Sequence, residues 1–293
     1  MKHAVSIFLL GAVVCLGCDT RTPSYDDSTT ETGAAAVAEA MAAICPQSEL
    51  TRAEDGTVTG CRVCLPGMDF ENERGFEWEL RRATFGHFTA ASADNLILSG
   101  IGCESHSSNF GGSLLFVLQS GKPQLMTYHK ALITENCQKL RLQDGRDFLV
   151  CEHEWGGQGW AWSFVWSVVF HHPGNSEISA LFTTEDSLKT CGEDPEGDSR
   201  HPVQHSTIQS IRFPDLNGDG LADMSIRATL GKKLLTETER QACVRAVNAL
   251  EPPPVRIPTK EYQIDFLFDG KQFHVAPASK NVIALFPTPR FPN

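Results

Sequence analysis

The chain has 293 residues, and its 36 acidic residues against 25 Lys and Arg give a formal net charge of −11 at pH 7. This charge argues against nucleic acid and anionic lipid headgroups as partners, because both would repel the protein. The length is enough for one large β domain or two small ones.

The N-terminus has the features of a targeting segment. Lys2 and His3 precede an apolar run over residues 4–16. Such a run is too short to span a bilayer stably and is typical of a signal peptide. We therefore expect residues 1–17 to be removed on export, which places the mature chain outside the cytoplasm, in the cell envelope.

The end of this segment carries a lipid attachment signal. Residues 14–18 read Val-Cys-Leu-Gly-Cys and resemble the bacterial lipobox, in which a small residue precedes a cysteine that is diacylated. By this resemblance Cys18 is a lipid anchor to a membrane, and Gly17 lies on the cleaved side. Cys15 departs from the pattern, because the family usually has Leu there. Cleavage without lipidation is the alternative.

Residues 18–56 are expected to form a lipidated tether. Residues 19–33 are rich in Asp, Thr, Ser and Gly and offer little to bury, which is typical of a mobile stalk. The Ala-rich run over residues 34–44 predicts a short helix that ends at Cys45 and Pro46.

Eight cysteines remain after Cys15 and Cys18 are set aside. In an oxidising compartment an even number predicts disulfides, and we expect four, with the pairing left open. The C-x-x-C over residues 61–64 could be a redox or zinc half-site, but the eight remaining cysteines include no second C-x-x-C to complete such a site. The eight are Cys45, Cys61, Cys64, Cys103, Cys137, Cys151, Cys191 and Cys243.

Residues 57–293 are expected to form a mainly β domain, because short apolar runs alternate with Gly, Pro, Asn and Asp. Three stretches are degenerate copies of one pattern, in which a strand, an acidic turn and further strands follow one another. The last acidic residues of the three turns are Asp94, Asp147 and Asp223. Four-stranded repeats of about 40–55 residues are typical of propeller blades.

The third turn carries the strongest motif of the chain. Side-chain oxygens alternate around Gly220, as a Ca²⁺ loop requires. An EF-hand is excluded, because Ile226 stands where the bidentate Glu is needed and a strand-like run over residues 224–228 follows. A solvated turn without an ion is the alternative. The expected ligands of one Ca²⁺ are the side chains of Asp215, Asn217, Asp219 and Asp223 and the carbonyl of Leu221.

The form D-x-N-x-D-G-x-x-D followed by a strand resembles the FG-GAP or VCBS-type repeat of calcium-bearing β-propeller domains. The resemblance covers about residues 82–276, and only the third copy matches strongly. It implies a propeller-like array of degenerate blades with one ion site and two vestigial turns. An incomplete propeller and a β-sandwich are the alternatives.

An inserted helix is expected over residues 236–250. Thr236 and Glu239 form a capping-box pattern, and three prolines from Pro252 stop the helix. We expect the helix to pack on the β domain, with its cysteine in a disulfide. One apolar face is formed by Cys243, Ala246, Val247 and Leu250.

Large apolar side chains alternate along residues 160–170, which places them all on one face of a strand. The simpler interpretation is a core strand between packed sheets, since aromatics dominate cores. The alternative is a platform for stacking a sugar. The residues of this possible ligand platform are Trp155, Trp160, Trp162 and Trp166.

Catalytic motifs are weak. Glu152 and Glu154 flank His153, but alternation sends the carboxylates to one face and the imidazole to the other, as in a solvated strand end. His201 and His205 have H-x-x-x-H spacing, but Pro202 argues against the helix that would align them. G-x-S-x-G, H-E-x-x-H and P-loop patterns are absent from the sequence.

These features predict a non-catalytic, calcium-binding extracytoplasmic lipoprotein that binds a protein or glycan. By the resemblance, the ion is structural and the function is binding. A secreted hydrolase that acts on glycans, with the Trp-rich strand as a subsite, is the alternative. A purely structural envelope protein is a third hypothesis.

Overall fold

The computed structural model describes residues 24–26, 31–65, 67–70, 75–104, 111–157, 159–171, 175–194 and 197–289. The protein is mainly β, with two large sheets that are not closed into a barrel and one small hairpin. The predicted signal peptide and Cys18 lie outside the described residues. Among the described helices, none has the length and apolar character needed to span a membrane.

The first sheet contains a meander of four antiparallel strands, β4 to β7. A hairpin of β2 and β3 extends it beside β4, and β1 pairs with β4 in parallel. These strands are β1 (Ser24–Asp26), β2 (Leu50–Arg52), β3 (Val58–Cys61), β4 (Trp78–Gly86), β5 (Asn95–Ile101), β6 (Gly111–Gln119) and β7 (Lys122–Lys130).

The second sheet contains two further four-stranded antiparallel meanders. The strand pairing between these two meanders is confined to one residue pair, Asp186 of β11 with His205 of β14. The second meander is β8 (Cys137–Arg141), β9 (Asp147–Gly157), β10 (Trp160–His171) and β11 (Asn175–Asp186); the third is β14 (Val203–Arg212), β15 (Met224–Lys233), β16 (Lys260–Phe268) and β17 (Phe273–Val275).

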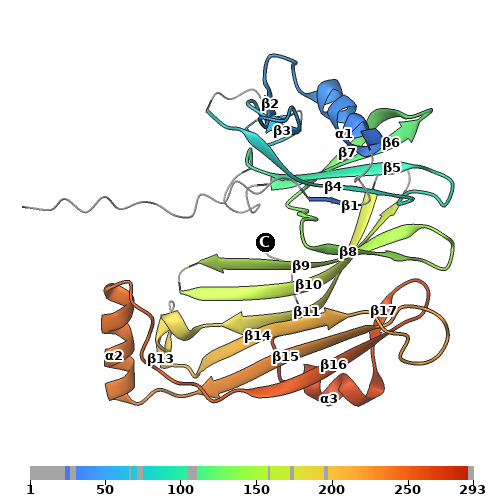
Figure 1. Ribbon diagram of the computed structural model, residues 1–293. Helices are drawn as coiled ribbons and strands as arrows, with labels where there is room; N and C mark the ends of the chain where they lie inside the picture. Colours follow the sequence, from blue (N-terminus) through green and yellow to red (C-terminus); the bar gives the residue numbers. More distant parts are fainter. Residues whose placement is uncertain are drawn as a thin grey trace, which may run out of the picture.

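The three meanders lie one above another, with the second in the middle (Figure 1). Ile97 and Leu115 of the first meander meet Phe170 of the second in one core. Phe182 of the second meets Phe266 of the third in another core. The strand β10 contributes Val165 to the second core and Trp166 to the first, so it has apolar residues on both faces at successive positions.

The predicted Ala-rich helix is present as α1 (Glu31–Ile44), and it packs on the folded body. Its Val37 and Met41 are buried with Leu96 and Leu98 of β5. This outer face of the first meander is apolar and has to be covered, and small Ala side chains allow a helix to approach it closely. The folded body therefore begins within the segment for which the sequence predicts a tether, and it also includes β1 and β2.

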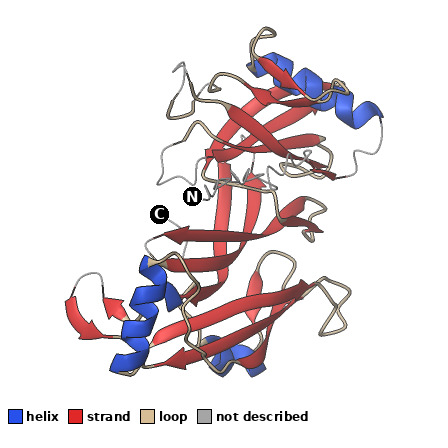
Figure 2. Cartoon of the chain, turned by 60° about the vertical axis from the view of Figure 1, so that its left-hand side comes forward, coloured by secondary structure: helices blue, strands red, loops and turns tan. Residues whose placement is uncertain are grey.

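The predicted insertion helix is confirmed as α2 (Glu237–Asn248). Both hydrogen bonds of the capping box between Thr236 and Glu239 are present. Leu250 departs from the predicted apolar face, because the helix ends before it and leaves its side chain 95% exposed. A short helix, α3 (Lys280–Ile283), packs against β16. Figure 2 shows α1 and α2 at opposite ends of the molecule.

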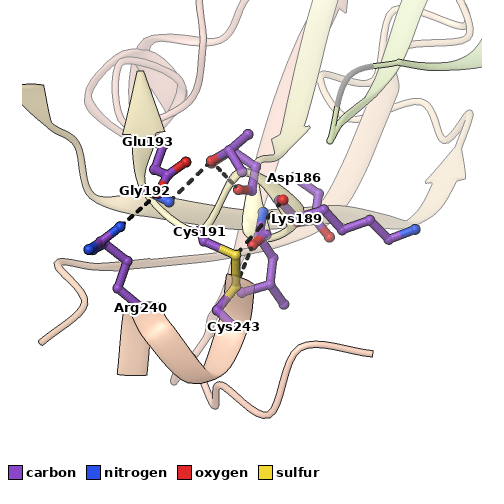
Figure 3. Close-up of a disulfide and its surroundings, with 10 residues drawn as sticks. Asp186, Lys189, Cys191, Gly192, Glu193, Arg240 and Cys243 are labelled. Carbon is purple, nitrogen blue, oxygen red and sulfur yellow. Dashed lines mark hydrogen bonds and ion pairs between the residues drawn. A yellow bond between two sulfur atoms is a disulfide. The ribbon is translucent and has the colours of Figure 1, made fainter. Parts of the chain in front are cut away.

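The prediction of four disulfides is confirmed. The bridge from α2 ends between β11 and the hairpin of β12 (Glu193–Asp194) and β13 (Gly197–Arg200), where an ion pair of 2.7 Å between Glu193 and Arg240 accompanies it (Figure 3). The half-site interpretation of the C-x-x-C is wrong, because its two cysteines bond to different partners. The pairs are Cys45–Cys61, Cys64–Cys103, Cys137–Cys151 and Cys191–Cys243.

Candidate functional site

Each meander has a buried polar side chain at the start of its second strand. Asn95 Oδ1 accepts hydrogen bonds from Phe88 N and Thr89 N at 2.9 and 3.0 Å. Asp147 Oδ2 accepts from His87 N, at 2.8 Å, and so links the first two meanders. Asn95, Asp147 and Asp223 are all buried, so the three meanders share this feature.

The position equivalent to Asp147 in the first copy is one residue later than the sequence predicts. Asp94 is exposed and lies 3.5 Å from His87 Nδ1, whereas Asn95 is buried. Gly86 is needed beside this link, because a Cβ there would lie 2.8 Å from Asp147 Oδ2.

The predicted calcium loop folds back on itself. Asp215 accepts hydrogen bonds from Gly218 N at 2.7 Å and from Gly220 N at 3.0 Å. Both glycines have positive φ, near 80°, which favours glycine over other residues. Asn217 donates to Asp219 Oδ2 at 2.9 Å, so the side chains of three predicted ligands lie together and exposed.

Asp223 is separated from these ligands by burial. It is 0% exposed, and its oxygens accept hydrogen bonds from Leu216 N at 2.8 Å and Phe268 N at 2.7 Å. Within the described ranges there is no cluster of three or more His, Cys, Asp or Glu side chains with metal-binding geometry. The exposed oxygens and the Leu221 carbonyl fit Ca²⁺ by type, and Asp223 fits a role in the fold.

Calcium is expected to raise the unfolding temperature if this loop binds it. For a Kd on the order of 10⁻⁴–10⁻³ M, a tenfold excess adds about 1.4 kcal/mol, or roughly 3–6 °C. Thermal unfolding in calcium and in chelator measures the shift. It should disappear in Asp219→Ala and persist in Asp94→Ala, an exposed acid in the equivalent turn. An equal shift in wild type and Asp219→Ala would place any bound ion elsewhere.

The predicted platform divides into an exposed part and a buried part. Trp155 of β9 lies opposite Trp162 of β10, with ring centroids 4.8 Å apart. Trp160 stacks on Trp162 at 5.7 Å, with the rings nearly parallel. Trp166 lies in the core between the first and second meanders with Phe170, so it is not part of the platform. The core interpretation is confirmed for the inner part of this strand, and Trp155, Trp160 and Trp162 lie outside that core.

One carboxylate lies on the face of the stacked indoles: Trp162 Nε1 donates to Glu185 Oε2 at 3.3 Å. A cavity of about 320 Å³ is lined by residues of the same strand ends, including Trp155 and Trp162. Its carboxylates and the hydroxyls of Ser163 and Thr184 lie on the opposite face of the sheet from the indole rings. Its polar side chains are Glu154, Asp186, Ser163, Thr184, Ser206 and Thr207.

The strand register confirms that Glu152 and Glu154 share one face and His153 the other, since they lie opposite Val165, Ser163 and Phe164. Glu152 and His153 are half-buried, although a solvated strand end was expected. Burial raises the pKa of Glu152, and the charge of Glu154 raises it further. Burial lowers the pKa of His153, against the charges of Glu135 and Glu154, which raise it.

No family model, curated protein or solved structure matches this chain. Its function is therefore inferred from its own residues.

One pair could suggest nucleophilic catalysis. His205 Nδ1 lies 2.8 Å from Asp186 Oδ2, and Ser206 is adjacent. The Ser206 hydroxyl accepts from Glu185 N at 2.8 Å and donates to Glu185 O at 2.9 Å, so it is held in the joint between β11 and β14. This arrangement favours a structural role for Ser206 over that of a nucleophile.

Proposed function

We propose that this protein is an extracytoplasmic lipoprotein that binds a glycan on the stack of Trp155, Trp162 and Trp160. Cys18 attaches it to a membrane, and one Ca²⁺ stabilises the loop at residues 215–221. The observation that carries the proposal is the continuation of the aromatic row beyond the core, to an indole that is 37% exposed.

The chemistry of the stack suits a sugar. An indole face provides a large, rigid apolar surface for the C–H face of a pyranose ring. The carboxylate of Glu185, which lies opposite Trp162 and accepts a hydrogen bond from its indole N–H, provides a hydrogen-bond partner for the sugar hydroxyls. A wholly buried role for the row would leave Trp155 without a reason to be large and exposed.

We also propose that the meanders are degenerate blades of the FG-GAP or VCBS type. Three four-stranded antiparallel units, each with a buried polar residue at the start of the second strand, support this proposal. In this proposal Ca²⁺ neutralises the exposed acids of the one intact loop and fixes its turn.

Trp162→Ala and Trp155→Ala should each weaken glycan binding by about 1–2 kcal/mol, or about five- to thirtyfold in Kd, through loss of stacking. A glycan array followed by calorimetry on the best ligand measures this. Phe76→Ala is the matched control, because Phe76 is also 37% exposed and stacked on another ring, Phe70, in the segment before β4. Binding that survives both Trp substitutions would refute the proposed site.

A glycan hydrolase is the second proposal, because Glu154 and Asp186 line one cavity, on the opposite face of the sheet from the stack. Glycoside hydrolysis commonly uses two carboxylates that flank the bond. Glu154→Gln and Asp186→Asn distinguish the two functions. Turnover of a bound glycan that both substitutions abolish would replace binding with hydrolysis.

A further inference from the structure

A second cavity, of about 540 Å³, lies at the far end of β10 from the tryptophan stack. It opens between the second and third meanders, where the β8–β9 turn, the ends of β10 and β11 and the β16–β17 turn meet. This volume is within the usual range for a small-molecule site. The glycan proposal does not involve this cavity.

The walls of the cavity are held in place by hydrogen bonds. Gln143 N donates to Gly270 O at 3.0 Å, which joins the β8–β9 turn to the β16–β17 turn. Asp269 Oδ1 accepts from Lys271 N and Gln272 N at 2.9 and 2.8 Å and so fixes the second turn. The site is therefore formed before any ligand arrives, which lowers the entropy lost on binding.

Two cations of the lining retain free donors. Arg146 donates through Nε to Asp144 at 2.8 Å and through Nη1 to Phe170 O at 3.0 Å. Its Nη2 has no partner among the residues that the structure describes, and neither has Lys271 Nζ. The two side chains come from the two facing turns.

Carboxylates balance these cations. Asp144 and Asp269 already accept hydrogen bonds within their own turns. The N–H of Gln272, together with His274, lowers the pKa of Asp269 to about 2. Glu177 lies at the exposed rim, with its Oε2 3.6 Å from His171 Nε2. With three carboxylates and two permanent cations, the lining disfavours a simple anion and suits a molecule that carries both charges.

We propose that this cavity binds a small zwitterion, namely a free amino acid or a short peptide with charged termini. The carboxylate of the ligand binds Arg146 Nη2 and Lys271 Nζ, and its ammonium group binds Glu177. The apolar part of the ligand packs on Leu142 and Val169, which also line the cavity.

Calorimetry with the purified full chain tests this, using glycine, alanine, leucine and alanyl-alanine as probes. N-acetylated and C-amidated versions of each probe are the chemical controls. Zwitterionic probes should bind, and blocking either terminus should weaken binding at least about tenfold. Tight binding of amino acids or of the dipeptide identifies the preferred class, and either supports the proposal.

Lys271→Gln and Glu177→Gln should each weaken zwitterion binding about tenfold, with an unchanged unfolding temperature, because both side chains are exposed. Trp162→Ala should leave it unchanged, so failure of the glycan proposal is measured separately. Lys232→Gln, an exposed lysine on β15, is the charge-matched control. The proposal would be overturned if no probe showed saturable binding up to about 10 mM. It would also be overturned if blocked probes bound as well as zwitterionic ones, or if the Gln variants bound as well as the wild type.

Discussion

Asp223→Ala is expected to lower the free energy of unfolding by about 3–5 kcal/mol. The substitution leaves the N–H groups of Leu216 and Phe268 without their acceptor in a fully buried position. Hydrogen bonds to a charged group contribute about 1.5–3 kcal/mol each, and an unsatisfied buried donor adds a desolvation penalty. The loss should be the same in calcium and in chelator if the role of Asp223 is structural.

Urea unfolding in chelator measures this loss. Asp223→Asn keeps one acceptor oxygen and should lose less than Asp223→Ala. Asp219→Ala is the matched control in the same loop, and in chelator it should change stability by no more than about 0.5 kcal/mol, because the side chain is exposed. Equal losses for Asp223→Ala and Asp219→Ala would contradict the assignment of separate roles.

Removing the Cys191–Cys243 bridge by a double Ala substitution should cost up to about 4 kcal/mol, since the bridge closes a loop between residues 52 apart. The bridge is buried and holds α2 against the segment that joins the second and third meanders. Without it the unfolded chain gains conformational entropy, and α2 is tied only by its packing and surface ion pairs.

Denaturant unfolding of this double variant is compared with that of Cys45→Ala/Cys61→Ala. That bridge spans 16 residues, so its loss should cost less, up to about 3 kcal/mol. A larger loss from the shorter loop would mean that local packing, and not loop closure, sets the contribution of these bridges. Reduction of the wild type should destabilise it at least as much as either double variant.

The strands and α2 could be predicted because their signals are local. Alternation, Gly-containing turns and the pairing of Thr236 with Glu239 act over a few residues. The alignment of Asp94 with Asp147 and Asp223 was wrong, because burial in a turn is not decided by the local sequence alone. Which of two neighbouring polar residues points inward depends on the length and path of the turn, and the structure selects Asn95.

Alternation alone could not predict that Trp166 is buried while Trp155 is exposed. Alternation places Trp162 and Trp166 on one face, but burial depends on what lies opposite that face. The first meander supplies Ile97 and Leu115 opposite Trp166, and this cover does not extend over Trp155.

The packing of α1 and the second cavity are also non-local. The Ala-rich run carries no sign of the apolar sheet face that covers Val37 and Met41. Arg146 and Lys271 meet only because two turns from different repeats lie together, and neither turn has a recognisable ligand motif.

The outward face of the third meander is polar. Its cross-strand contacts are polar, with Arg227 bound to Glu261 and Ser225 bound to Asp265 at 2.6 Å. A further layer could dock there only by stripping water from these charges, which is unfavourable without matched partners. At the opposite end α1 occupies the apolar face. Within the described residues the array is therefore capped at both ends, like the terminal units of a solenoid, and these two faces offer no exposed apolar layer for end-to-end association of copies.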